Sequence, residues 1–154
     1  MRILQTLLFS ILFVGACGPS FVIHAHDDYY ELSTGSGDAF DYRATSASGI
    51  RLGVREFENE GHGSQAFWEQ AIRNQLQFHA GYAITEETEI RAHSGETGRL
   101  FHCGKDEASQ TYDYWVAVFV ADDQVFVVEA GGLRAQFEPD RTDLQAAFES
   151  FEIH

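Results

Sequence analysis

The chain has 154 residues and carries 24 Asp and Glu against 10 Lys and Arg, a formal net charge of −14. So large an acidic excess argues against a nucleic-acid-binding protein and against electrostatic adhesion to anionic lipid. The chain is long enough for one domain with a modest hydrophobic core.

Residues 1–16 predict an export signal. A basic Arg2 is followed by an apolar stretch that is too short to span a bilayer, and then by two small residues. The tetrapeptide VGAC, which ends at Cys17, resembles the lipobox of bacterial lipoproteins. The resemblance implies cleavage before Cys17, diacylglycerol on its sulfur and acylation of its new amino group. Several acyl chains on one residue anchor a protein stably, so the lipid bilayer is its first expected partner.

Gly18, rather than Asp, follows the expected lipidation site. In Gram-negative lipoproteins this points to the outer membrane, with the protein facing the periplasm. The alternative is an ordinary signal peptide in which Cys17 occurs by chance. With Cys17 lipidated, Cys103 is the other cysteine of the chain and has no disulfide partner, so stability must come from packing.

Residues 17–38 are of mixed composition and end in a Ser/Gly-rich stretch, which predicts a lipidated tether. The segment contains His24 and His26 followed by Asp27 and Asp28, a set that could bind a divalent metal such as Zn²⁺. We favour a flexible tether with chance histidines, because ordering a flexible segment around a metal costs conformational entropy. No metal or cofactor is therefore expected.

The next elements are a hairpin and a helix. Alternating apolar residues predict strands over 40–46 and 50–57, joined by a short turn. Ser64 is a good N-cap for the amphipathic segment QAFWEQAIRNQLQFH, and Gly81 follows its end. The expected apolar face of this helix is Phe67, Trp68, Ala71, Ile72 and Leu76.

Four further strands and a helix are predicted. The strands cover 82–90, 99–104, 112–121 and 124–130, and the last two form a hairpin around Asp122-Asp123. Both faces of 112–121 are apolar, which predicts a central strand covered on both sides. A final helix is expected over 140–151, with Pro139 near its start.

These elements predict an α+β domain over residues 39–154, with an antiparallel sheet of about six strands and helices packed on its faces. The segments DYRATSASGIRLGVREF, AFWEQAIRNQL, GYAI, YWVAVFVADDQVFVVEAGG and AAFESF, in this order, resemble the PsbP-like α/β/α sandwich. The resemblance covers about residues 39–153 and rests on element order and hydrophobic pattern. It implies a binding or assembly accessory rather than an enzyme, and it carries over no functional residue.

Glu129 lies inside an apolar strand and must find a partner if it is buried. Arg55, Arg99 and Arg134 are the candidate partners. The carboxylate is then either half of a structural ion pair, which we favour, or the polar end of a pocket.

Signals for catalysis are weak. His102 and Cys103 are neighbours in a predicted strand, so their side chains point to opposite faces and a buried thiol is expected. The pattern from Gly61 to Ala66 fits G-x-G-x-x-A, but it follows a hairpin strand rather than opening a parallel βαβ unit. Glu87 and Glu89 share one face, which fits a solvated edge strand.

The sequence therefore predicts a membrane-anchored envelope lipoprotein that is not an enzyme. Its domain would bind an envelope protein partner or assist assembly. The alternative is a module that binds a small ligand or a metal. An exposed apolar patch would favour the first function, and a concave pocket with converging polar groups would favour the second.

Overall fold

The computed structural model describes residues 20–154, so the predicted signal peptide and Cys17 lie outside the described residues. The strands are β1 Phe21–Val22, β2 Tyr29–Glu31, β3 Tyr42–Ser46, β4 Arg51–Glu58, β5 Ala83–Arg91, β6 Thr97–Glu107, β7 Gln110–Ala121, β8 Gln124–Leu133 and β9 Glu152–Ile153. Helix α1 (Gln65–Asn74) continues into a π-helix, η1 (Gln75–His79), and α2 spans Arg134–Glu149. No helix of this part of the chain is long and apolar enough to cross a bilayer.

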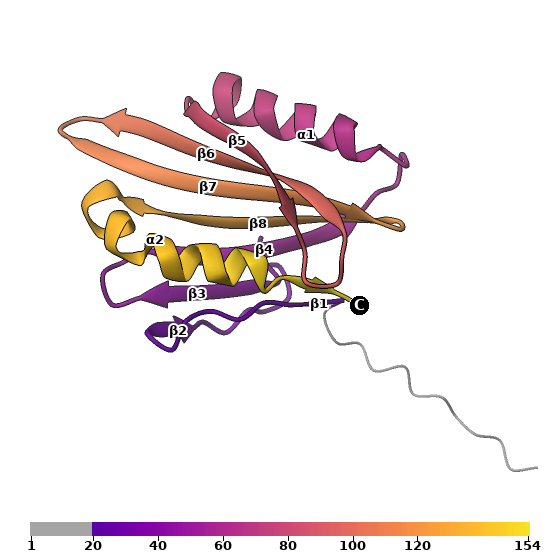
Figure 1. The fold of residues 1–154 in the computed structure, drawn as a ribbon, viewed down its shortest axis with the longest axis horizontal. Helices are drawn as coiled ribbons and strands as arrows, with labels where there is room; N and C mark the ends of the chain where they lie inside the picture. The colour runs from indigo at the N-terminus through magenta and orange to yellow at the C-terminus, as the bar shows by residue number, and fades with distance from the viewer. Residues whose placement is uncertain (1–19) are drawn as a thin grey trace, which may run out of the picture.

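Seven strands form one antiparallel sheet in the order β2-β3-β4-β8-β7-β6-β5, and β1 and β9 pair separately. The two helices lie on opposite faces of this sheet (Figure 1). The prediction of an α+β fold with helices on an antiparallel sheet is confirmed. The seventh strand is β2, which lies in a segment that the sequence did not predict to be folded.

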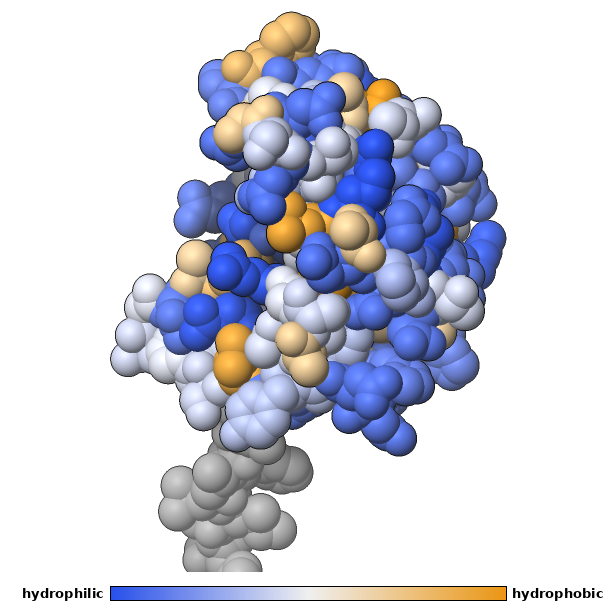
Figure 2. All heavy atoms as spheres, turned by 90° about the vertical axis from the view of Figure 1, so that its left-hand side faces the viewer, coloured by the Kyte–Doolittle hydropathy of each residue, from blue (hydrophilic) through white to orange (hydrophobic). Residues whose placement is uncertain are grey.

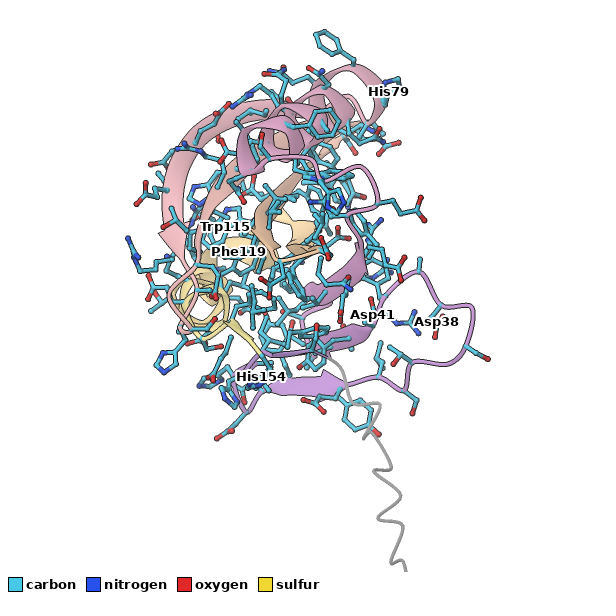
Figure 3. All side chains as sticks on the ribbon, turned by 90° about the vertical axis from the view of Figure 1, so that its right-hand side faces the viewer. Asp38, Asp41, His79, Trp115, Phe119 and His154 are labelled. Atoms are coloured by element: carbon cyan, nitrogen blue, oxygen red, sulfur yellow. The ribbon has the colours of Figure 1, made fainter. Side chains whose placement is uncertain are left out.

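Strand β7 lies inside the sheet, between β8 and β6, and both of its faces are buried. Trp115 and Phe119 pack with α2, and Figure 3 shows both in the interior of the molecule. Val116 and Val118 pack in the cluster on the α1 side. All four side chains are at most 2% exposed, which confirms the predicted central strand. Asp122, in the turn to β8, has a positive φ of 50°, a conformation that Asp tolerates better than most residues.

The predicted tether is wrong from Phe21 onward. Phe21 is 4% exposed, and its ring lies 5.7 Å from that of Phe151. Strand β1 pairs with β9, and β2 pairs with β3, so the domain begins before residue 39. The physical reason is long-range: the C-terminal end of the chain supplies the partner strand and much of the apolar surface that orders this segment.

Helix α2 begins at Arg134, six residues before the predicted start, and Pro139 lies inside it. Proline lacks the N–H that would bond to the carbonyl of Ala135, so the helix loses one backbone hydrogen bond and some of its stability there. Phe137 is fully buried in the first turns and packs 5.3 Å from Trp115, ring to ring. Burial of that ring outweighs the missing hydrogen bond.

Helix α1 begins as predicted, with Ser64 Oγ accepting a hydrogen bond from Phe67 N at 3.2 Å. Gly81 follows the helical segment with a positive φ of 71°. Leu76 is buried, and Trp68 and Ile72 pack against the same cluster. Phe67 was expected on this face but is 58% exposed, because the helix meets the sheet through a narrower stripe than its hydrophobic pattern indicated.

We expect Trp115→Asp to unfold the domain, because it removes a large buried ring and places a carboxylate beside Phe137, Phe148 and the sheet. The cost should exceed about 4 kcal/mol. Chemical denaturation followed by circular dichroism checks this. Tyr30, which is 74% exposed, supplies the control: Tyr30→Asp should shift the midpoint little. An unchanged midpoint for Trp115→Asp would contradict the central position of β7.

Candidate functional site

Helix α1 covers only part of its face of the sheet. It lies over β6 and β7, where Gln65 Nε2 donates to Val118 O at 3.1 Å and Val120 N donates to Gln65 Oε1 at 3.0 Å. The face beside it is hollowed into a groove of about 880 Å³. Its aromatic lining is Phe40, Tyr82, Tyr112 and Tyr114, and its charged lining includes Arg43, Arg51 and Glu129.

Two glycines make room for the aromatic rings of the groove. A Cβ atom at Gly53 would lie 2.7 Å from the Phe40 ring, and one at Gly131 would lie 2.8 Å from the Tyr114 ring. Any larger residue would have to displace these rings. Gly53 lies within the predicted strand 50–57 and Gly131 directly follows the predicted strand 124–130, and the sequence analysis assigned neither a packing role.

Glu129 lines the groove and is paired with Arg55. Arg55 Nη2 donates to both carboxylate oxygens, at 2.8 and 2.9 Å, and the Glu129 side chain is only 11% exposed. The Arg55 guanidinium also lies 4.5 Å from the centre of the Phe40 ring. The Glu129 carboxylate is thus half of an ion pair and also part of the wall of the groove. The two roles that the sequence suggested as alternatives are both present.

The other two candidate partners are wrong. Arg134 pairs with Asp113 at 2.7 Å, and Arg99 pairs with Glu69 at 3.3 Å. Strand register decides the choice, because Gly53 lies directly opposite Glu129 and Arg55 is two residues further on the same face. Pairing between strands 74 residues apart cannot be read from the sequence.

Tyr82 and Tyr114 form a stacked pair along the groove, with ring centroids 5.0 Å apart and planes inclined by 24°. Burial raises the pKa of both phenols, and the nearby Glu129 charge raises that of Tyr114 further. Both rings therefore remain neutral at physiological pH. They offer flat apolar surface with a hydroxyl group at the edge.

Unpaired cations flank the groove. In the described residues 20–154, three Lys and Arg side chains have no carboxylate oxygen within 4.0 Å, namely Arg51, Arg91 and Lys105. Arg51 lines the groove from β4. Lys105 Nζ lies 5.7 Å from the centre of the Tyr82 ring, at the wall formed with β6. Figure 2 shows the end of the molecule where β8 meets α2, with small apolar areas among hydrophilic residues.

A second, smaller pocket of about 210 Å³ lies on the α2 face beside His102. Its charges are largely paired with one another: Arg134 with Asp113 at 2.7 Å, and Arg141 with Glu138 at 2.8 Å. The His102 ring stacks on Trp115 at 4.3 Å, and burial lowers the pKa of His102. These mutual contacts fit a structural network between the sheet and α2. The Arg134–Asp113 pair was not predicted from the sequence, although Asp113 shares a strand face with Trp115.

His102 and Cys103 point to opposite faces of β6, as predicted. His102 lies on the α2 side, and Cys103 is 3% exposed in the cluster under α1. Burial raises the pKa of the Cys103 thiol to about 12, so very little of the reactive thiolate forms at neutral pH.

The glycine-containing loop before α1 closes on itself. Asn59 Nδ2 donates to Gly63 O, and Gly63 N donates to Asn59 Oδ1, at 2.9 and 2.8 Å. The preceding strand, β4, is antiparallel to both of its neighbours, so the parallel unit of a dinucleotide site is not formed here.

His24 and His26 belong to the folded part of the chain rather than to a flexible tether. His24 N donates to Ser150 Oγ at 2.9 Å, and His26 Nδ1 lies 3.4 Å from Asp28. Across residues 20–154, no group of three or more His, Cys, Asp or Glu residues is arranged to hold a metal ion. Glu87, on the edge strand β5, pairs with Arg73 of α1 at 2.6 Å.

No family model and no curated protein matches this sequence. Solved structures do match. LpqN of Mycobacterium tuberculosis, described as involved in cell envelope biogenesis, has a TM-score of 0.65 at 13% identity, over 90% of this chain and 87% of LpqN. CyanoP, the cyanobacterial PsbP of Synechocystis sp. PCC 6803, has a TM-score of 0.59 at 9% identity, over 92% and 99% of the two chains.

The Ran-binding protein Mog1p of Saccharomyces cerevisiae also matches, with a TM-score of 0.59 at 13% identity, over 90% of this chain and 92% of Mog1p. The chain therefore has the PsbP/Mog1-like fold, and the fold implied by the PsbP-like resemblance is confirmed. At these identities the likeness concerns the fold alone.

Proposed function

We propose that this protein is a lipid-anchored binding protein of the bacterial cell envelope, and that its groove binds a small amphiphilic anion. The groove is the observation that carries the proposal, because it is concave, uncovered by α1 and lined by both aromatic rings and charged groups. The lipobox-like VGAC supports export and anchoring. The fold shared with LpqN, a protein involved in cell envelope biogenesis, supports an envelope role.

The size of the groove and its aromatic lining indicate that part of the ligand is apolar. A groove of about 880 Å³ is within the usual range for small-molecule sites. The stacked rings of Tyr82 and Tyr114, with Phe40 across the sheet, offer flat surfaces to an acyl chain or an aromatic ring.

The anionic half follows from charge. Arg55 neutralises Glu129, so this carboxylate does not repel an anion. Arg51 and Lys105 flank the groove without ion-pair partners in the described part of a chain whose net charge is −14. Charged donors left unpaired beside an apolar groove fit a carboxylate, sulfonate or phosphate group on the ligand.

We propose binding without catalysis. The thiol of Cys103 is buried in the cluster beneath α1 and does not line the groove, and the charges of the smaller pocket are engaged with one another. In a Gram-negative host, Gly18 after Cys17 supports the outer membrane, with the domain facing the periplasm, as the location.

We expect Cys17→Ser to abolish membrane retention, because the acyl chains would be its only stable attachment. Fractionation of cells into membrane and soluble pools, with immunoblotting, measures this. Cys103→Ser is the matched control and should remain with the membranes, because Cys103 is buried in the domain. A Cys17→Ser protein that still sediments with membranes would refute the lipid anchor.

We expect the soluble Cys17→Ser protein to bind dodecanoate more tightly than dodecyltrimethylammonium, a cation with the same alkyl chain. Adding Arg51→Gln or Lys105→Gln should each weaken dodecanoate binding about tenfold, the usual size of one charge-assisted contact. Isothermal titration calorimetry measures both.

Arg91, which is exposed and outside the groove, supplies the control, and Arg91→Gln should leave the affinity unchanged. Equal affinity for the two detergents, or no effect of either groove substitution, would reject an anionic ligand.

A second candidate function is docking to an envelope protein, and exposed aromatic residues on the helical segment favour it. Phe67 of α1 is 58% exposed and Phe78 of η1 is 77% exposed, and π-helices often occur at functional sites. The two residues are eleven positions apart, so they can present apolar surface along one side of the helical segment.

If this surface binds a protein, Phe67→Ser combined with Phe78→Ser should remove a partner that is recovered by crosslinking in cells and mass spectrometry. Folding should be unaffected, since both side chains are exposed. Tyr30→Ser, at 74% exposure, is the control and should retain the partner. Unchanged recovery with the double variant would remove this candidate.

A further inference from the structure

The folded domain begins very close to the proposed lipidation site. His154 N donates to Ser20 O at 2.8 Å, and Ser20 Oγ donates to Glu56 at 2.6 Å. The next residue, Phe21, is 4% exposed and is held against Phe151 and Phe126. Ser20 is therefore fixed to the body of the domain, at the end where β1 and β9 pair.

Chain length then limits how far this end can lie from the lipid. Three residue steps separate Cys17 from Ser20 in the sequence. A fully extended chain covers about 3.3–3.6 Å per residue, so the two residues are at most about 11 Å apart. A tether that continued to residue 38, as the sequence suggested, would have allowed about 70 Å.

We propose that the anchored domain lies with its β1–β9 end against the bilayer and with its groove at the opposite end, open to the aqueous side. This inference rests on the proposed lipid anchor and is independent of the ligand. Phe126, beside Phe21, marks the membrane end of β8, and Leu133 lines the groove at the other end. Seven residues of antiparallel strand separate them, or about 24 Å. Figure 1 shows the C-terminus beside β1, far from the β6–β7 turn.

Charge indicates that the short connection, rather than adhesion, holds this end at the membrane. The end carries Glu56 and Glu152, with Asp122 and Asp123 in the nearby β7–β8 turn. The β5–β6 turn, which contacts β9 through Ser94, adds Glu96 and the cation Arg91, so carboxylates outnumber Lys and Arg there. Carboxylates repel anionic lipid headgroups over about a Debye length, roughly 8 Å at physiological salt. A ligand would thus enter the groove from the aqueous compartment rather than from the bilayer beneath the domain.

Site-specific fluorescence quenching tests this arrangement in the full-length lipidated protein. His154→Cys places a label beside Ser20, and Ser109→Cys places one in the exposed β6–β7 turn at the other end. The buried Cys103 should not compete for the label. Each labelled protein is reconstituted in vesicles that contain lipids with nitroxide headgroups. We expect several-fold stronger quenching at position 154 than at position 109.

A matched variant carries a Gly/Ser insert of about twelve residues after Gly18, with an r.m.s. span of about 20 Å. Its quenching at position 154 should fall markedly, because the acidic end can then move away. Equal quenching at the two positions, or quenching at 154 that is insensitive to the insert, would overturn the proposed orientation while leaving the anchor intact. Protein that fails to associate with vesicles would overturn the lipid anchor itself.

Discussion

Burial of the β7–β8 hairpin on both faces is the constraint on which the rest of the structure depends. Trp115 needs cover on one face and Val116 needs cover on the other. Helix α2, near the C-terminus, covers the first face, and α1 with η1, from the middle of the chain, covers the second. The ring of Trp115 lies 5.3 Å from Phe137 and 4.3 Å from His102, so one residue links the sheet to the C-terminal helix and to the neighbouring strand. Removing apolar surface from water at this centre stabilises all the elements around it.

The groove follows from unequal cover on those two faces. Helix α1 is short and lies mainly over β6 and β7. It reaches only the Phe57 end of β4 and the Val125–Val127 part of β8, so the rest of that face has no helix over it. The rings of Phe40 and Tyr114 pack against Gly53 and Gly131 there. Arg55 forms an ion pair with the largely buried carboxylate of Glu129. A partly buried pair of this kind is a weak source of stability, because desolvation of Glu129 offsets much of the attraction. Its position in a groove wall is therefore more informative about binding than about folding.

The two ends of the chain are joined through β1 and β9, and this pairing connects the proposed anchor to the fold. Phe21 packs on Phe151 and follows Cys17 by only four residues. An attachment at Cys17 would therefore act almost directly on the end of the domain that contains Phe151 and the start of β8. With the proposed lipid anchor, the protein is a domain attached directly at one end rather than a domain on a long flexible tether. That difference decides which surfaces can meet a membrane and which can meet a solute.

Local patterns in the sequence by themselves determined the elements. Alternation over 112–121, the Asp122-Asp123 turn and the Ser64 cap all predicted structure that formed, because strand period, turn chemistry and capping act between near neighbours. The opposite directions of His102 and Cys103 follow from the same strand period.

Only the tertiary structure decided what depends on residues far apart in the chain. It selected Arg55 rather than Arg99 or Arg134 for Glu129, since strand register sets that contact. It ordered Phe21 through a partner strand at the other end of the chain and placed Pro139 within a helix that Phe137 stabilises by burial. It also left one half of a sheet face open. These contacts depend on which surfaces meet in the folded chain, and neither the composition nor the periodicity of the sequence determines which surfaces meet.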